Sequence, residues 1–228
     1  MNTQLAEIAF ILDRSRSMSP LKEAAVTAFN AFVKSQIDVP GDANLTLVQF
    51  DESYEVPVLA RPLKEVPELT AATYVPRGTT ALFDAIGRTI NETAQRLNAL
   101  PDEEKPGKVI MAIFTDGYEN ASQEYNSKQI SEIIRVHRDT HGWEFLFLGA
   151  NQDAVASARA MHMDPHLSSS VDFSAKGMQS GWMAGSRKTR SLRMKFSGIM
   201  DWQAMEDDRK TLAEILKEEE QKAGDSHS

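Results

Sequence analysis

The stretch AEIAFILDRSRS, residues 6–17, decides the fold of this chain. Residues 6–12 are apolar on both faces of an extended chain, which is typical of a central strand in a parallel sheet. The polar run 13–17 follows at once, so it lies where that strand ends. Two more buried strands are indicated at 108–114 and 143–148. The chain is therefore predicted to build a sheet around the first of these strands.

Helical patterns alternate with the strands. We expect helices near 20–37, 82–97, 127–140 and 152–161, and weaker strands near 44–50, 53–59 and 168–173. This alternation predicts an α/β fold with a doubly wound, mostly parallel central sheet flanked by helices, which is a Rossmann-like arrangement. Ligands of such sheets bind beyond the carboxyl ends of the strands.

The C-terminal part of the chain has a different pattern. Residues 174–222 contain no strong strand and predict two helices, split near Gly198. We therefore divide the chain into a domain over 1–173, a helical C-terminal extension over 174–223 and a disordered tail over 224–228. An apolar stripe that includes Trp202, Leu212 and Leu216 is expected to pack on the domain, or else on a partner or a second copy.

The composition limits the classes of function. The net charge of −8 disfavours broad nucleic-acid binding, because an acidic protein is repelled by phosphates. The basic stretch 187–195 could bind an acidic partner locally, but a solvated helix face balanced by the acidic C-terminus is the favoured interpretation. Cysteine is absent, and no signal peptide or apolar run of the ~20 residues that span a membrane is present. These features predict a cytoplasmic protein without membrane contact.

Two aspartates mark the predicted ligand edge. Asp13 follows the first strand, and Asp116 follows the strand at 108–114. Oxygen-only groups gathered there suit a hard cation such as Mg²⁺, Mn²⁺ or Ca²⁺. Taken one at a time, these residues would equally suit helix capping at Asp13 and a turn at Asp116-Gly117.

Five positions together resemble the metal-ion-dependent adhesion site of von Willebrand factor A-type domains. The matching residues, over a resemblance that covers about 5–173, are Asp13, Ser15, Ser17, Thr80 and Asp116. Residues 146–153 are also similar to small intracellular bacterial and phage-encoded members. The resemblance implies one divalent cation, first of all Mg²⁺, which those five residues hold. It further implies a protein partner that presents Asp or Glu to the metal, and no enzymatic activity.

Other interpretations stay open at this point. A metal-dependent phosphate-ester hydrolase is the main alternative, although Ser15 stands where such a phosphatase fold would need a second aspartate. The third interpretation is a degenerate domain that binds through its C-terminal helices without metal.

Arg14 and Arg16 could attract an acidic ligand or project into solvent. Of the remaining polar residues, a metal role for His162 and His166 is disfavoured by Pro165, and Asn151 and Asp153 suit helix capping at the rim of the site.

Overall fold

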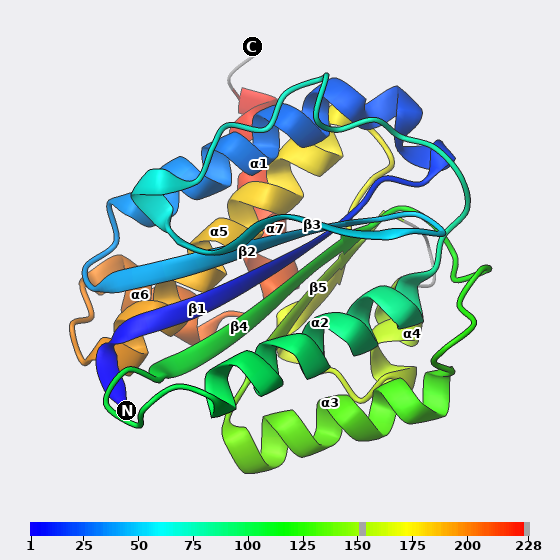
Figure 1. Cartoon of the computed structure of the whole chain (residues 1–228). Helices are drawn as coiled ribbons and strands as arrows, with labels where there is room; N and C mark the ends of the chain where they lie inside the picture. The colour runs from blue at the N-terminus through cyan, green and yellow to red at the C-terminus, as the bar shows by residue number, and fades with distance from the viewer. Residues whose placement is uncertain (151–153, 226–228) are drawn as a thin grey trace.

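A computed structural model describes residues 1–150 and 154–225. Its centre is a six-stranded sheet in the order β3-β2-β1-β4-β5-β6 (Figure 1). The strands are β1 (Asn2–Asp13), β2 (Asp42–Phe50), β3 (Tyr54–Pro62), β4 (Pro106–Thr115), β5 (Glu144–Gly149) and β6 (Ser168–Ser170). Among these six strands only β3 is antiparallel to its neighbour, because a short turn joins it to β2. The predicted doubly wound, mostly parallel fold is confirmed.

Helices cover both faces of this sheet (Figure 1). One face carries α1 (Lys22–Ile37) and α5 (Ala175–Ser197), and the other carries α2 (Leu82–Asn98), α3 (Ser127–His141) and α4 (Ala154–Ala160). Short 3-10 turns lie at Arg16–Leu21, Leu63–Glu65 and Pro165–Leu167. Successive residues of β1 face opposite sides, so Phe10 packs in the α1 core and Ile11 in the α2 core.

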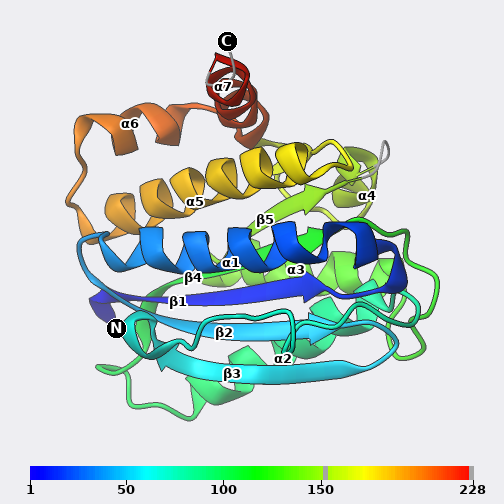
Figure 2. The same cartoon turned by 90° about the horizontal axis from the view of Figure 1, so that it is seen from above.

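Helix α5 belongs to the core of the sheet. Its Trp182 is 3% exposed, and its ring centroid lies 4.9 Å from that of Phe10 and 4.7 Å from that of Phe114. Figure 2 shows α5 between α1 and the last two helices. The division of the chain at residue 173 stays a prediction, but α5 shares its hydrophobic core with the strands before that boundary.

Within the described residues, three helices follow β6, not the predicted two. Helix α5 ends at Ser197, so the predicted split near Gly198 is confirmed, and Gly198 caps the helix in the left-handed conformation. The remainder is split into α6 (Trp202–Arg209) and α7 (Leu212–Asp225). The split follows from a capping box that sequence reasoning missed: Thr211 Oγ1 accepts from the Glu214 N–H, and the Glu214 carboxylate accepts from the Thr211 N–H. Helix α7 extends two residues into the tail predicted to be disordered, and 226–228 lie outside the described residues.

Trp202 does not pack on the domain, which was the first of the predicted alternatives; packing on a partner or a second copy stays a prediction. Leu212 and Leu216 are buried as expected, whereas Trp202 is 73% exposed. Charged contacts to α5 set the rotation of α6, so that Asp207 faces inward to Arg187 and Trp202 faces outward. One apolar stripe in the sequence therefore becomes two separate surfaces.

The basic stretch 187–195 holds these last helices in place. Arg187 pairs with Asp207, Glu218 and Glu219. The other pairs join Lys188 to the carbonyls of Asp207, Asp208 and Lys210, Arg190 to Asp201, Arg193 to the carbonyls of Gln36 and Gly41, and Lys195 to Asp208. The predicted solvated helix face is wrong, because Lys188 and Arg193 are each 3% exposed. The ion pairs of Arg187 and Lys195 support the other half of that interpretation, that the acidic C-terminus balances the charge of the stretch.

No helix in the described ranges is both long enough and apolar enough to cross a membrane.

Candidate metal site at the carboxyl ends of the strands

The two predicted aspartates meet at the ends of neighbouring strands. Leu12 of β1 is in register with Phe114 of β4, so Asp13 lies beside Thr115. The Thr115 hydroxyl donates to Asp13 Oδ2 over 2.6 Å, and the Ser15 N–H donates to Asp13 Oδ1 over 2.7 Å. Asp13 is fully buried and Asp116 is 7% exposed. Strand register thus fixes both carboxylates at one edge of the sheet.

A chain of hydroxyl contacts joins the two loops. Ser15 Oγ lies 3.0 Å from Ser17 Oγ, and the Ser17 hydroxyl donates to Asp116 Oδ1 over 2.9 Å. Ser15 is buried, whereas Ser17 is exposed at the surface. Asp116 Oδ2 is buried and has no hydrogen-bond partner among the residues that the structure describes. The site therefore has an accessible side at Ser17 and an unsatisfied oxygen beneath it.

Thr80 reaches the same place from the loop before α2. A side-chain Cβ on Gly117 would lie 2.7 Å from Thr80 Oγ1 and 3.5 Å from Asp13 Oδ2, so Gly117 allows these groups to approach. The Asn120 side chain accepts from the Thr80 N–H over 2.9 Å, and the Asn120 N–H donates back to the Thr80 carbonyl over 3.0 Å. This reciprocal pair fixes the Thr80 backbone against the loop that follows Asp116.

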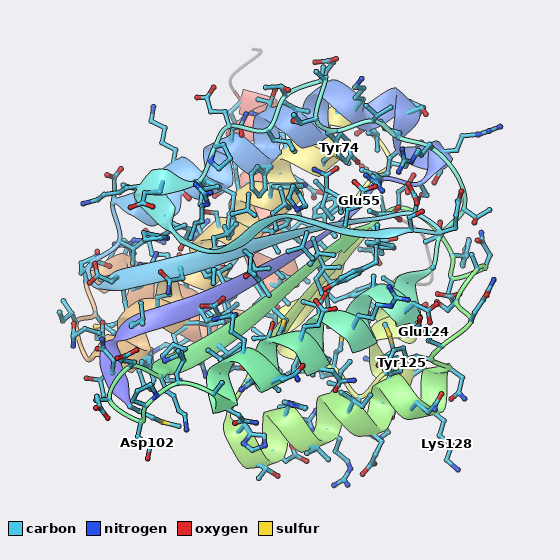
Figure 3. The ribbon with its side chains drawn as sticks, in the orientation of Figure 1. Glu55, Tyr74, Asp102, Glu124, Tyr125 and Lys128 are labelled. Carbon is cyan, nitrogen blue, oxygen red and sulfur yellow. The ribbon has the colours of Figure 1, made fainter. Side chains whose placement is uncertain are left out.

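The loop after β4 also caps α2. Glu119 accepts from the Phe83 N–H over 2.9 Å, which supplies the cap that α2 lacks in its own sequence. In return, the Asp84 carboxylate accepts from three successive N–H groups, those of Gln123, Glu124 and Tyr125. Figure 3 shows Glu124 and Tyr125 in this loop, on the α2 side of the sheet. The segments that carry Thr80 and Asp116 are thus tied together.

Arg14 has neither of the roles that its sequence position suggested. It is 4% exposed, and its guanidinium donates to Asp51 and Glu55 over 2.7–2.9 Å. Arg77 pairs with the same two carboxylates, and its N–H donates to the Arg14 carbonyl. Arg14 is therefore neutralised internally and braces the loops. Arg16 is exposed beside Ser17, which leaves it free to meet a ligand or solvent as predicted.

Burial disfavours the charged form of both site aspartates, and repulsion between them adds to this effect at Asp116. Burial raises the pKa of Asp13 above its ordinary value. Burial, and then the negative charge of Asp13, raise the pKa of Asp116 to about 6. No ion pair to either carboxylate occurs in the described part of the chain. A cation between the loops would relieve this repulsion, so the residues fit a metal ion.

Other candidates from the sequence do not join this site. His162 precedes the Pro165–Leu167 turn and contacts Ser131 Oγ through its Nδ1, so it does not share one helix with His166. Asn151 and Asp153 lie outside the described residues. No cluster of three or more His, Cys, Asp or Glu side chains suited to a metal occurs within residues 1–150 and 154–225. The candidate site is instead rich in hydroxyls.

Sequence reasoning missed the residues that support the site. Tyr74 is fully buried, and its hydroxyl donates to the Asp13 carbonyl over 2.5 Å. Figure 3 shows Tyr74 and Glu55 at the same end of the sheet, opposite Asp102. Nothing in the local sequence marks Tyr74 or Asn120, because their partners lie 61 and 40 residues away.

Comparison with known proteins supports the fold. The sequence matches the family model of the von Willebrand factor type A domain over residues 7–180. No curated protein matches the chain in sequence. Among solved structures, proximal thread matrix protein 1 from the mussel byssus is similar, with a TM-score of 0.60, 15% identity, and coverage of 80% of this chain and 45% of that protein. The present chain therefore spans less than half of that relative.

Two further structures are similar at the level of the fold. Manganese-loaded TRAP protein of Plasmodium vivax has a TM-score of 0.52 and 13% identity over 76% of this chain and 70% of that one. The pilus adhesin SpaC of Lactobacillus rhamnosus GG has a TM-score of 0.60 and 13% identity over 84% of this chain and 31% of that one. The mussel protein has also been solved with a zinc-occupied adhesion motif.

Proposed function

The chain belongs to the von Willebrand factor type A domain family, and from that premise we propose that it is a metal-dependent protein-binding module. In this proposal Asp13, Ser15, Ser17, Thr80 and Asp116 hold one divalent cation. A carboxylate from a partner protein completes the coordination of that cation. The module would act as an adaptor or an assembly component.

The observation that carries the proposal is the contact chain from Ser15 through Ser17 to Asp116. It joins side chains that are up to 101 residues apart in sequence, and it ends at a carboxylate with one unsatisfied buried oxygen. Buried polar atoms normally have partners, so an orphaned carboxylate oxygen indicates a missing ligand. A cation is the ligand that its charge favours.

The donor set favours a hard cation with open positions. Three of the five groups are neutral hydroxyls, which neutralise a metal less than carboxylates do. Oxygen ligands suit Mg²⁺, and Mn²⁺ or Ca²⁺ would also fit. The manganese and zinc named for the relatives belong to those proteins. A poorly neutralised cation would attract an acidic side chain of a partner, because opposite charges attract strongly where water is partly excluded.

Binding explains the site better than catalysis. A phosphate-ester hydrolase of the type considered above would need a second aspartate at the position of Ser15, and that serine instead contacts Ser17. We therefore propose that the metal bridges two proteins without turnover. A cytoplasmic location and the absence of nucleic-acid binding stay predictions from composition.

The direct test is the Asp116→Ala variant, assayed for metal and for partner. Calorimetric titration with Mg²⁺ and Mn²⁺ should show one site in the native protein and none in the variant. Affinity capture from the native host should recover a partner that EDTA releases, and the variant should lose binding by a few kcal/mol. Asp102→Ala is the matched control, because Asp102 lies at the opposite end of the sheet (Figure 3).

One result would end this proposal. If Asp116→Ala protein is folded, binds no metal and still captures its partner at full affinity, the metal does not form the bridge. The surface helices would then be the better candidate.

A further inference from the structure

A small cavity opens beside the candidate metal site. Its volume is about 130 Å³, and it lies between the loop after Asp116 and the facing ends of α2, α3 and α4. Gly117 contributes to its wall, and a Cβ added to this glycine would lie 2.7 Å from Thr80 Oγ1 and 3.5 Å from Asp13 Oδ2. Gly117 therefore borders both the cavity and the candidate metal site.

The floor of this cavity is part of the hydrophobic core. Leu82, Phe147 and Met161 line it, and each is no more than 3% exposed. Ala160 and Ser157 of α4 form its outer wall. The described lining holds a single charged residue, Glu119, whose carboxylate is already occupied by the N–H groups of Phe83, Ala121 and Ser122. The chemistry inside favours an apolar group.

The size of the cavity matches one side chain. An apolar protein cavity of roughly 150 Å³ can hold a benzene-sized molecule. The volume here is slightly smaller, which suits Leu, Ile, Val or Met and excludes Trp. Gly117 has no side chain, so an incoming peptide can pass close to the backbone between the two sites.

We propose that this cavity receives an aliphatic side chain that neighbours the acidic residue in the partner. The inference rests on the proposed function, because the partner's carboxylate places the peptide over Gly117. The metal would then select an acid, and the cavity would select which acidic sequence binds. Filling a cavity of this kind changes affinity by about ten- to a hundredfold per matched group.

The test uses a displayed peptide library with a fixed central Asp and random flanking positions. It is selected in Mg²⁺ and eluted first with EDTA and then with acid, so that peptides that EDTA does not release are also recovered. The full chain is compared with Ala160→Leu, which fills the cavity, and with Ala156→Leu, which adds the same side chain on an exposed part of α4 outside the cavity. Both changes keep a good helix former, and melting curves check the fold.

We expect the native chain and Ala156→Leu to enrich Leu, Ile, Val or Met at one flanking position. Ala160→Leu should keep the EDTA-released selection for the acid and lose that preference. The affinity of an enriched peptide should fall about ten- to a hundredfold when its aliphatic residue is replaced by Ala, but only for the two proteins whose cavity is open.

The outcomes separate the two ideas. If EDTA releases the peptides but they show no aliphatic preference, the cavity proposal is overturned and the metal function stands. The same holds if Ala160→Leu shows the same aliphatic preference as the native chain. An aliphatic preference that Ala160→Leu removes, on peptides that EDTA does not release, supports the cavity and overturns the metal bridge. Failure to enrich any peptide overturns the cavity proposal.

Discussion

Two regions of this protein bury charge in opposite ways. At the carboxyl ends of β1 and β4, Asp13 and Asp116 lie close together without an ion pair among the described residues. At α5, by contrast, Arg187 is surrounded by three carboxylates from α6 and α7. Where buried charges are balanced within the chain, the loss of one partner destabilises the fold. Buried charges without a partner are costly, so they indicate a ligand that comes from outside the chain. The comparison separates a structural charge cluster from a candidate binding site.

The largest expected effect comes from breaking the balanced cluster. Arg187→Ala should lower the free energy of unfolding by about 3–5 kcal/mol, because it leaves the buried Asp207 without its ion-pair partner and the buried Glu219 with the exposed Lys222 alone. Denaturant titration measures the change. Arg135→Ala, which removes an exposed pair with Glu132 on α3, should change stability by less than about 1 kcal/mol. Similar losses in both variants would show that the α5 cluster has no special role.

The unbalanced site should respond in the opposite direction. Without metal, Asp116→Asn should stabilise the protein at pH 8 by about 1–3 kcal/mol, because it removes a buried charge that faces Asp13. Since the folded pKa of about 6 lies above the ordinary value of 3.8, the native state binds protons more readily than the unfolded state. Stability of the metal-free native protein should therefore fall as pH rises from 4 through 6.

The same titration contains its own control. Burial also raises the pKa of Glu7 to about 7, but that group is present in both proteins, so the difference between them isolates Asp116. Saturating Mg²⁺ should remove the advantage of the variant. Equal pH profiles for the two proteins in metal-free buffer would mean that burial and Asp13 do not raise the pKa of Asp116.

A smaller effect should follow from loosening Thr80. Asn120→Ala removes the acceptor of the Thr80 N–H and should weaken Mn²⁺ binding about 10- to 100-fold, as expected for a group that orients a ligand. Asn120→Asp keeps an acceptor oxygen and should restore most of the affinity. Calorimetry gives the affinities, and the melting temperature shows whether the fold is intact. If Ala and Asp variants bind Mn²⁺ equally well, Asn120 does not position Thr80.

The smallest effect is expected at Trp202. Trp202→Ser should change the free energy of unfolding by less than about 0.5 kcal/mol, since the side chain is 73% exposed. Leu212→Ala, at a fully buried position of the next helix, should cost about 2–5 kcal/mol. Equilibrium unfolding of both variants compares them. A large loss at Trp202 would place the two residues in one packed stripe after all.

Much of the fold and of the candidate site could be read from local patterns. Residues 6–12 and 108–114 predicted buried strands because their apolar runs are continuous, and the structure places β1 and β4 there side by side. Parallel neighbours end at one edge, so the aspartates at 13 and 116 were bound to meet. That reasoning needed no knowledge of side-chain contacts.

The tertiary structure decided what local patterns could not. The capping box at Thr211 was visible in sequence and was missed, but the outward rotation of Trp202 depends on ion pairs between α5 and α6. The sequence position of Arg14 suggested a role toward a ligand, but the fold brings Asp51 of the β2–β3 turn and Glu55 of β3 to its guanidinium. Sequence periodicity reports which face of an element is apolar, whereas the partner of a charge is fixed only when distant segments pack together.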